Sequence, residues 1–153
     1  NLSLARREAD LAVRLGRPDP PQASAQRLGD VPYAVYAAVG RDPDLLPWAG
    51  LDHQSAHLPE ARWTARAAGR RGVEHKASRF EALARMAAAG AVRALLPHLV
   101  GDDTAGLIRV GRPAVLAREA WLIGHPGDAA APHVRAAREW IAAAFARRVQ
   151  DAG

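Results

Sequence analysis

The sequence predicts an α/β fold. Three observations support this prediction: short apolar runs alternate with segments of helical periodicity, 49% of the 153 residues are hydrophobic, and residues 72 to 97 have the pattern strand, helix, strand. The length suits one compact domain or two small lobes. Because the sequence contains no cysteine, it excludes a disulfide framework and a thiolate metal site.

The elements of the first half follow from apolar runs and turn residues. Residues 10 to 15 ("DLAVRL") and 32 to 39 ("PYAVYAAV") are apolar runs bounded by turn residues, as is typical of buried strands. Residues 40 to 60 are rich in Pro, Asp and Gly and predict turns with room for one helical turn. A short helix is expected from Pro59 onward, and a strand in residues 72 to 77.

The second half continues the alternation. Its helix is expected to begin with a capping box formed by Ser78 and Glu81 and to end at Gly90. Residues 93 to 96 then predict a strand closed by Pro97. Further strands are expected at residues 106 to 110 and 119 to 125, and a final helix at residues 132 to 148.

The charge pattern argues against a nucleic-acid-binding surface in this domain. The formal net charge is +5, but Lys76 is the one lysine among 21 basic residues, and the arginines are scattered. We therefore expect solvated surface charge and no tight DNA binding by this chain alone. Since there is no signal pattern and no apolar run of about 18 residues, we expect a cytoplasmic protein without membrane contact.

The start of the helix near residue 78 is a candidate anion site. In open α/β sheets, ligands lie outside the carboxyl ends of the strands. The free amides and the dipole of a helix start favour an anion, and Lys76 and Arg79 flank this one. The alternative is that Ser78 only caps the helix, and the residues leave both interpretations open.

Other chemistry finds little support. His53, His57 and Glu60 have a spacing that could bind a metal on a helix, but prolines and glycines crowd this region. Asp102 and Asp103 follow a glycine and are interpreted as turn formers. There is neither a G-x-S-x-G motif nor a phosphate-binding loop. We expect no metal, no cofactor and no enzymatic activity.

Six segments carry a resemblance to a known family. They are "READLAVRLGRP", "PYAVYAA", "HLPEARW", "SRFEALARMAAAGAVRALLPHLV", "GLIRV" and "EAWLIGHP...HVRAAREWI", in that order. Together they resemble the effector-binding domain of LysR-type transcriptional regulators, over nearly the whole chain. The resemblance implies a fold like a type 2 periplasmic binding protein, with two α/β lobes joined by two crossing strands and a small-molecule effector between the lobes. It places lobe I in residues 1–36 and 119–153, lobe II in residues 37–118, and the crossing strands in residues 33–38 and 119–124.

The resemblance also implies a ligand site and partners. Its effector-binding positions are Arg14, Gly16, Ser78, Arg79, Leu96 and Pro97. The effector is expected to be anionic or to carry a carboxylate. Hinge closure on the effector would control DNA binding by a separate N-terminal winged helix-turn-helix domain, in a homodimer or tetramer.

The chain departs from the family pattern in two places. It lacks the helix-turn-helix and the first strand and helix of lobe I, so we expect an incomplete domain in which residues 10 to 15 lack parallel neighbours and expose apolar surface. Where the family often has Gly-x-Gly, this sequence has Gly90, Ala91 and Val92. The rival functions are a stand-alone solute-binding or enzymatic α/β domain, and a degenerate remnant that only oligomerises.

Overall fold

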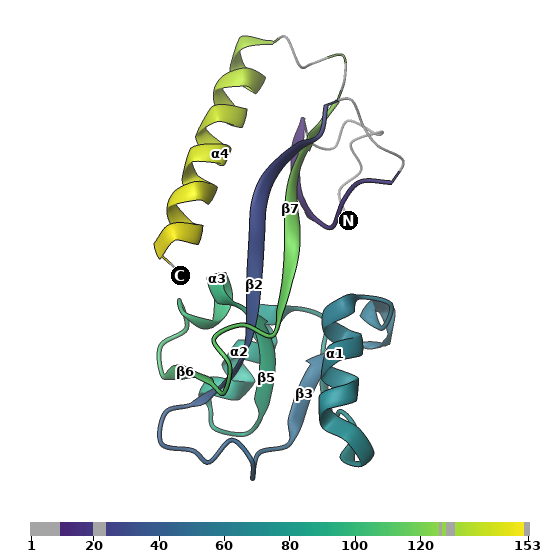
Figure 1. Ribbon diagram of the computed structural model, residues 1–153, viewed down its shortest axis with the longest axis vertical. Coiled ribbons are helices and arrows are strands. Elements are labelled where there is room, and N and C mark those ends of the chain that lie inside the picture. The colour runs from purple at the N-terminus through teal and green to yellow at the C-terminus, as the bar shows by residue number, and fades with distance from the viewer. Residues whose placement is uncertain (1–9, 20–23, 126, 128–130, 152–153) are drawn as a thin grey trace. The chain divides into compact units, whose positions relative to one another are not determined.

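The computed structural model describes residues 10–19, 24–125, 127 and 131–151 (Figure 1). In chain order the elements are β1 (Leu11–Leu15), β2 (Gln26–Ala38), β3 (Trp48–Leu51), the 3₁₀ turn η2 (His53–Ser55), α1 (Pro59–Ala68), the 3₁₀ turn η3 (Gly69–Arg71), β4 (His75–Ala77), α2 (Phe80–Ala88), β5 (Arg93–Pro97), α3 (His98–Gly101), β6 (Leu107–Val110), β7 (Leu116–Gly124) and α4 (Pro132–Asp151). In this part of the chain, no helix is both long and apolar enough to cross a membrane.

The chain divides into two compact units. Unit 1 comprises Asn1–Val31 and Arg118–Gly153, and unit 2 comprises Pro32–Ala117. The chain passes between the units within β2 and again within β7. These two strands are neighbours in the strand order β1-β7-β2-β5-β3-β4, and β6 pairs separately with β2.

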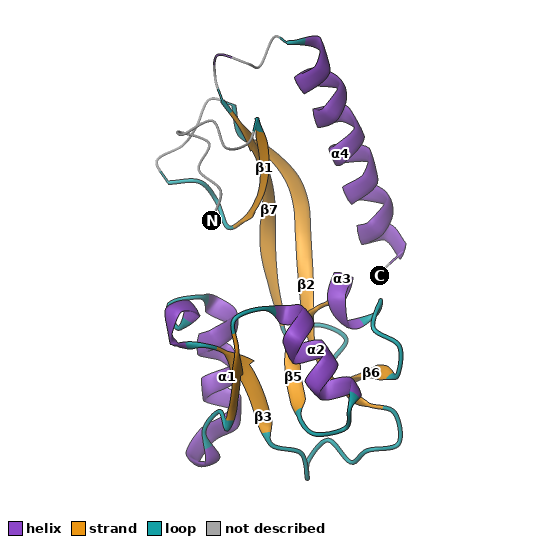
Figure 2. Ribbon diagram, turned by 180° about the vertical axis from the view of Figure 1, so that it is seen from behind, coloured by secondary structure: helices purple, strands orange, loops and turns teal. Residues whose placement is uncertain are grey.

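Unit 2 is built on a mixed sheet. β3 pairs in parallel with both β4 and β5, whereas β2 pairs antiparallel with β5 and with β6. Helices α1 and α2 lie on opposite faces of this sheet, as the two opposite views show (Figures 1 and 2). Each face needs its own apolar cover because successive side chains of a strand point to opposite faces.

The two faces have separate cores. Under α2, Leu83, Ala84 and Ala87 pack with Tyr36 and Leu96 of the sheet. On the α1 face, Val35 and Trp48 of the sheet pack with Ala68, and Trp63 forms a T-shaped ring pair with Trp48 at 5.9 Å between centroids. Successive residues of β2 therefore contribute to different cores: Val35 packs in the core on the α1 face and Tyr36 in the core under α2.

Unit 1 holds β1 against β7 in antiparallel register, from Leu11 opposite Gly124 to Leu15 opposite Ala120. β1 ends the strand order, and Val13 is 53% exposed. Leu11, Ala12 and Leu15 of the same strand are partly buried. Within the same unit, Val134 of α4 is buried, and Phe145 lies so close to Gly29 that a Cβ built there would be 3.2 Å from the Phe145 ring.

The expectation for residues 40 to 60 was correct for the turns and for one short helical turn, η2, but it missed β3, which lies inside this stretch. Its four residues are bounded by Pro47 and interrupted by Gly50, which hid the strand in the sequence. Its stability comes from burial between α1 and α2. A Cβ built at Gly50 would lie 3.1 Å from Val73 Cγ1 and 3.3 Å from Thr64 Cγ2. Glycine therefore allows the side chains of Val73 and Thr64 to pack closely against the β3 backbone.

Other boundaries also differ from the expectation. β2 begins at Gln26, six residues before the apolar run that predicted it, and the short helix α3 was not foreseen. β4 begins at His75, since Gly72 adopts φ 71° and the following Val73 packs into the α1-side core before the strand starts.

Candidate functional site

Three parallel strands of unit 2 end at one edge. Leu51 at the end of β3 lies opposite Ala77 at the end of β4, and the Asp52 amide donates to the Ala77 carbonyl at 3.0 Å. On the other side of β3, Ala49 lies opposite Ala94, so β5 reaches the same edge with Leu96 and Pro97. Carboxyl ends of parallel strands form the ligand-binding edge of open α/β sheets.

The helix α2 starts directly after β4 at this edge, but the expected capping box is wrong. The N-cap residue is Arg79, whose φ of −141° and ψ of 148° are extended, and no side chain caps this end. The Arg79 carbonyl accepts the first helical bond, from the Leu83 amide at 3.3 Å. Ser78 therefore lies one residue outside the helix, and Glu81 stands at the second helical position instead of the third.

The packing of α2 explains the later start. Phe80, the first helical residue, forms a T-shaped ring pair with Tyr33, with the centroids 5.7 Å apart. Leu83 and Ala84 are buried in the core beneath. Burial of this face fixes the rotation of the helix and outweighs the roughly 1 kcal/mol that a side-chain cap contributes.

The end of α2 is as expected. Gly90 takes φ 74° after the C-cap residue Ala89, and its amide donates to the Ala87 carbonyl at 2.9 Å. The Ala91 amide donates to the Met86 carbonyl at 3.4 Å. This pair of bonds is a Schellman motif, which requires the left-handed conformation that glycine adopts without strain.

The two apolar candidates at the edge differ from the polar ones in exposure. Ser78 and Arg79 are exposed. Leu96 is 0% exposed in the core under α2, and Pro97 is buried opposite Tyr33. Leu96 and Pro97 thus support the edge from inside, while Ser78 and Arg79 face solvent.

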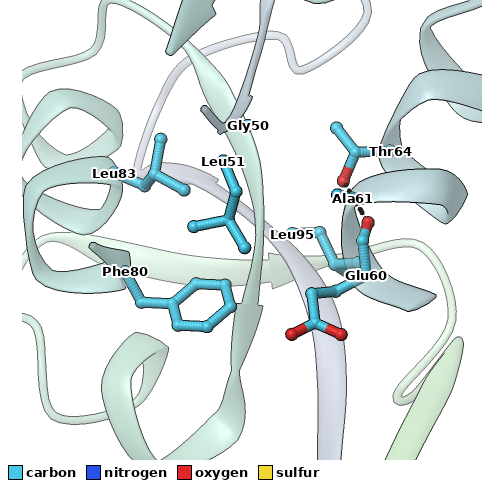
Figure 3. Close-up of a pocket in the computed structure, with 8 residues that line it drawn as sticks. All are labelled: Gly50, Leu51, Glu60, Ala61, Thr64, Phe80, Leu83 and Leu95. Atoms are coloured by element: carbon cyan, nitrogen blue, oxygen red, sulfur yellow. Dashed lines mark hydrogen bonds between the residues drawn. The ribbon is translucent and has the colours of Figure 1, made fainter. Parts of the chain in front are cut away.

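A recess lies between the starts of α1 and α2 (Figure 3). It is lined by Gly50, Leu51, Glu60, Ala61, Thr64, Phe80, Leu83 and Leu95. The lining side chains leave no space that a water molecule could fill. Inside α1, the Thr64 hydroxyl donates to the Glu60 carbonyl at 2.9 Å. The recess is a narrow gap between packed core side chains below this edge of the sheet, and it is too small to hold a ligand.

The remaining two candidates belong to unit 1. Arg14 is exposed on β1, opposite Trp121. Gly16 follows β1 with φ 94°, and its amide donates to the Glu119 carbonyl at 2.8 Å. A Cβ on Gly16 would lie 2.9 Å from Nη2 of Arg118. A larger residue would therefore be strained here both by this close contact and by the positive φ.

A side-chain network in unit 2 was not foreseen. The Tyr36 hydroxyl donates to Asp102 Oδ1 at 2.7 Å, and Arg109 grips the same carboxylate with Nε at 2.9 Å and Nη2 at 2.5 Å. Burial, together with the hydrogen bond to Asp102, raises the pKa of Tyr36. Partial burial raises the pKa of Asp102, but hydrogen bonds from Arg109 and Tyr36 outweigh it and hold this pKa below its ordinary value. Asp102 is therefore a structural anion and not only a turn former.

The three residues whose spacing could suit a metal on a helix do not share a helix. His53 is in η2, His57 is in the turn that follows, and Glu60 is buried in α1. Among the residues described, no group of three His, Cys, Asp or Glu side chains is placed to hold a metal ion.

Comparison with known proteins shows which family this chain resembles. The model of the LysR substrate binding domain matches residues 2–146. The Mau operon transcriptional activator of Paracoccus denitrificans is 28% identical over 151 residues, which cover 95% of this chain and 52% of that protein. This chain thus spans about half the length of that relative.

Solved structures share the fold. The regulatory domain of MexT, a transcriptional activator in Pseudomonas aeruginosa, has a TM-score of 0.65 at 21% identity over 93% of this chain and 75% of that chain. A candidate transcriptional regulator from Vibrio parahaemolyticus has a TM-score of 0.70 at 16% identity over 97% of this chain and 80% of that chain. The regulatory domain of CcmR from Synechocystis, in complex with 2-PG, has a TM-score of 0.66 at 15% identity over 93% and 76%. The predicted α/β fold of the type 2 periplasmic-binding-protein kind is confirmed.

Proposed function

Because this chain belongs to the LysR substrate-binding domain family, we propose that it is the effector-sensing part of a LysR-type transcriptional regulator. In this proposal a small molecule binds at the carboxyl-end edge of unit 2. A separate N-terminal domain contacts DNA, and the regulator works as a homo-oligomer in the cytoplasm. Unit 1 corresponds to lobe I and unit 2 to lobe II.

The start of α2 is the observation that carries the proposed ligand chemistry. No side chain caps this helix, and an exposed arginine occupies its N-cap position. A cation here opposes the helix dipole, whereas an anion would be stabilised by the dipole, by the amides of the first turn and by Arg79 together. Lys76, also exposed, lies on β4 three residues earlier. These features support an anionic or carboxylate-bearing effector.

The mechanism proposed for the response is a hinge. An effector held by Ser78 and Arg79 in lobe II would favour one arrangement of the lobes, with Arg14 and Gly16 as the positions that lobe I contributes. The two strands that pass between the units, β2 and β7, are then the segments that bend. A ligand shifts such an equilibrium only by its difference in affinity for the two states.

A binding titration tests this proposal. Phosphate, sulfate, succinate, benzoate and neutral glycerol are titrated calorimetrically into the wild type, Arg79→Ala and the control Arg85→Ala, which removes an exposed cation from the other end of α2. We expect an anion to bind and glycerol not to bind. Loss of a charge-assisted bond should weaken binding about 10- to 100-fold in Arg79→Ala. Equal binding by Arg79→Ala and Arg85→Ala contradicts the site, as does the absence of any anion binding.

A further inference from the structure

Two hydrogen bonds hold the turn between β6 and β7 against the rest of unit 2. The Pro113 carbonyl faces Nε2 of His98 at 2.9 Å, and the Val115 amide donates to the Tyr33 carbonyl at 2.9 Å. Because a carbonyl only accepts, Nε2 of His98 must carry a proton and donate it. Both bonds lie just before Leu116, where β7 begins.

His98 is itself held firmly. It follows Pro97, the last residue of β5, and opens α3, where its carbonyl accepts from the Asp102 amide at 2.9 Å. Its side chain is buried, and its ring meets the Tyr36 ring edge-to-face with the centroids 6.5 Å apart. Its backbone is therefore tied to the end of β5 and to α3, and its imidazole packs against the core.

We propose that His98 is a positioning residue that fastens the first residues of the connecting strand β7 to the carboxyl-end edge of β5. This inference rests on the proposed function, in which that edge binds the effector and β7 bends. With Pro113 and Val115 fixed, the bend that the proposed hinge requires would lie beyond Val115, where the chain leaves unit 2 between Ala117 and Arg118. A displacement of the edge then reaches β7 through the side-chain bond of His98, in addition to the backbone bond from Val115 to Tyr33.

The test is amide hydrogen exchange by mass spectrometry on the ligand-free protein. His98→Leu keeps apolar volume and removes the donor, and His98→Gln places an amide donor at similar reach. The matched control is Thr104→Val, which removes the bond from the Thr104 hydroxyl to the Val100 carbonyl at 2.7 Å, just after α3, without touching the turn.

In His98→Leu, we expect exchange in residues 111 to 118 to accelerate about five- to tenfold, the effect of one lost hydrogen bond, while β3 and β5 stay within about twofold. His98→Gln should recover most of the protection, and Thr104→Val should leave this segment unchanged. Unchanged exchange in His98→Leu overturns the proposal. So does an equal acceleration in β3 and β5, a failure of Gln to restore protection, or the same effect in Thr104→Val. The titration above fails or succeeds separately, so the two proposals can be told apart.

Discussion

Arg79→Asp is the sharpest perturbation of the site, because it should improve the helix while destroying the anion site. The backbone of Arg79 already has the extended conformation of an N-cap residue, and no side chain caps α2. An aspartate at this position can accept a hydrogen bond from the amide of Glu81 or Ala82 without any backbone change. Arg79 is exposed, so its removal costs little packing.

The magnitude follows from two contributions. A side-chain cap adds about 1 kcal/mol to the free energy of unfolding. Replacing a cation by an anion in the first turn adds about 0.3–1 kcal/mol at low salt. Arg79→Asp should therefore gain about 1–2 kcal/mol, and each kcal/mol raises Tm by about 2–4 °C in a chain of this size.

The assay is a thermal melt at low ionic strength, run on Arg79→Asp, Arg79→Ser and Arg79→Ala beside the wild type. Arg79→Ser supplies a cap without a charge and should lie between Asp and the wild type, whereas Arg79→Ala supplies no cap. A lower Tm for Arg79→Asp than for the wild type would refute the assignment of Arg79 as an uncapped N-cap. Undiminished binding of phosphate or carboxylates by the same variant would refute the anion site.

Three further predictions concern unit 2. Ser78→Ala should change the free energy of unfolding by less than about 0.5 kcal/mol, because Ser78 is exposed and outside the helix; a loss near 1 kcal/mol in urea denaturation would show that it is the cap after all. Gly101→Ala should cost about 2–3 kcal/mol in the same assay, because its Cβ would lie 2.2 Å from Tyr36 Cζ; a neutral effect would contradict this packing. The pKa of Asp102 is held low in the folded state, since hydrogen bonds from Arg109 and Tyr36 outweigh partial burial, so its stabilisation is present above the unfolded pKa near 3.8 and is lost as pH falls below it. Asp102→Asn should therefore lose less stability than the wild type between pH 5 and pH 3, and equal losses would contradict the role of the carboxylate.

The strand-helix-strand unit and the end of α2 could be predicted from the sequence because their signals are local. The apolar face of α2 and the glycine that ends it lie within a dozen residues. β3 could not be predicted, because four residues between Pro47 and Asp52 become a strand only through burial between two helices. Tertiary packing overrides propensity in such short runs.

The candidate site was predictable in part for the same reason. The sequence placed a helix start and two cations beside it, and the structure adds that three strand ends reach this edge. The sequence predicted the N-cap one residue too early. The Ser78–Glu81 pattern favours an N-cap at Ser78, whereas the burial of Leu83 in the core fixes a helix whose N-cap is Arg79. The contact of His98 with Pro113 spans 15 residues and the contact of Tyr36 with Asp102 spans 66, and no local pattern signals either one.

The thermodynamic linkage between anion binding and folding explains why the wild-type α2 begins with an uncapped arginine. Without ligand, the uncapped start leaves α2 about 1–2 kcal/mol less stable than the aspartate variant. An anion at about 100 times its Kd adds about 2.7 kcal/mol to a protein that binds it only when folded. The order of melting temperatures should therefore invert: Arg79→Asp melts above the wild type in the absence of a binding anion and below it at saturation. The measurement is one series of melts across the titration, with Arg85→Ala as the control whose ligand-induced rise in Tm should equal that of the wild type. If the two curves keep their order at every ligand concentration, Arg79 does not exchange helix stability for anion binding.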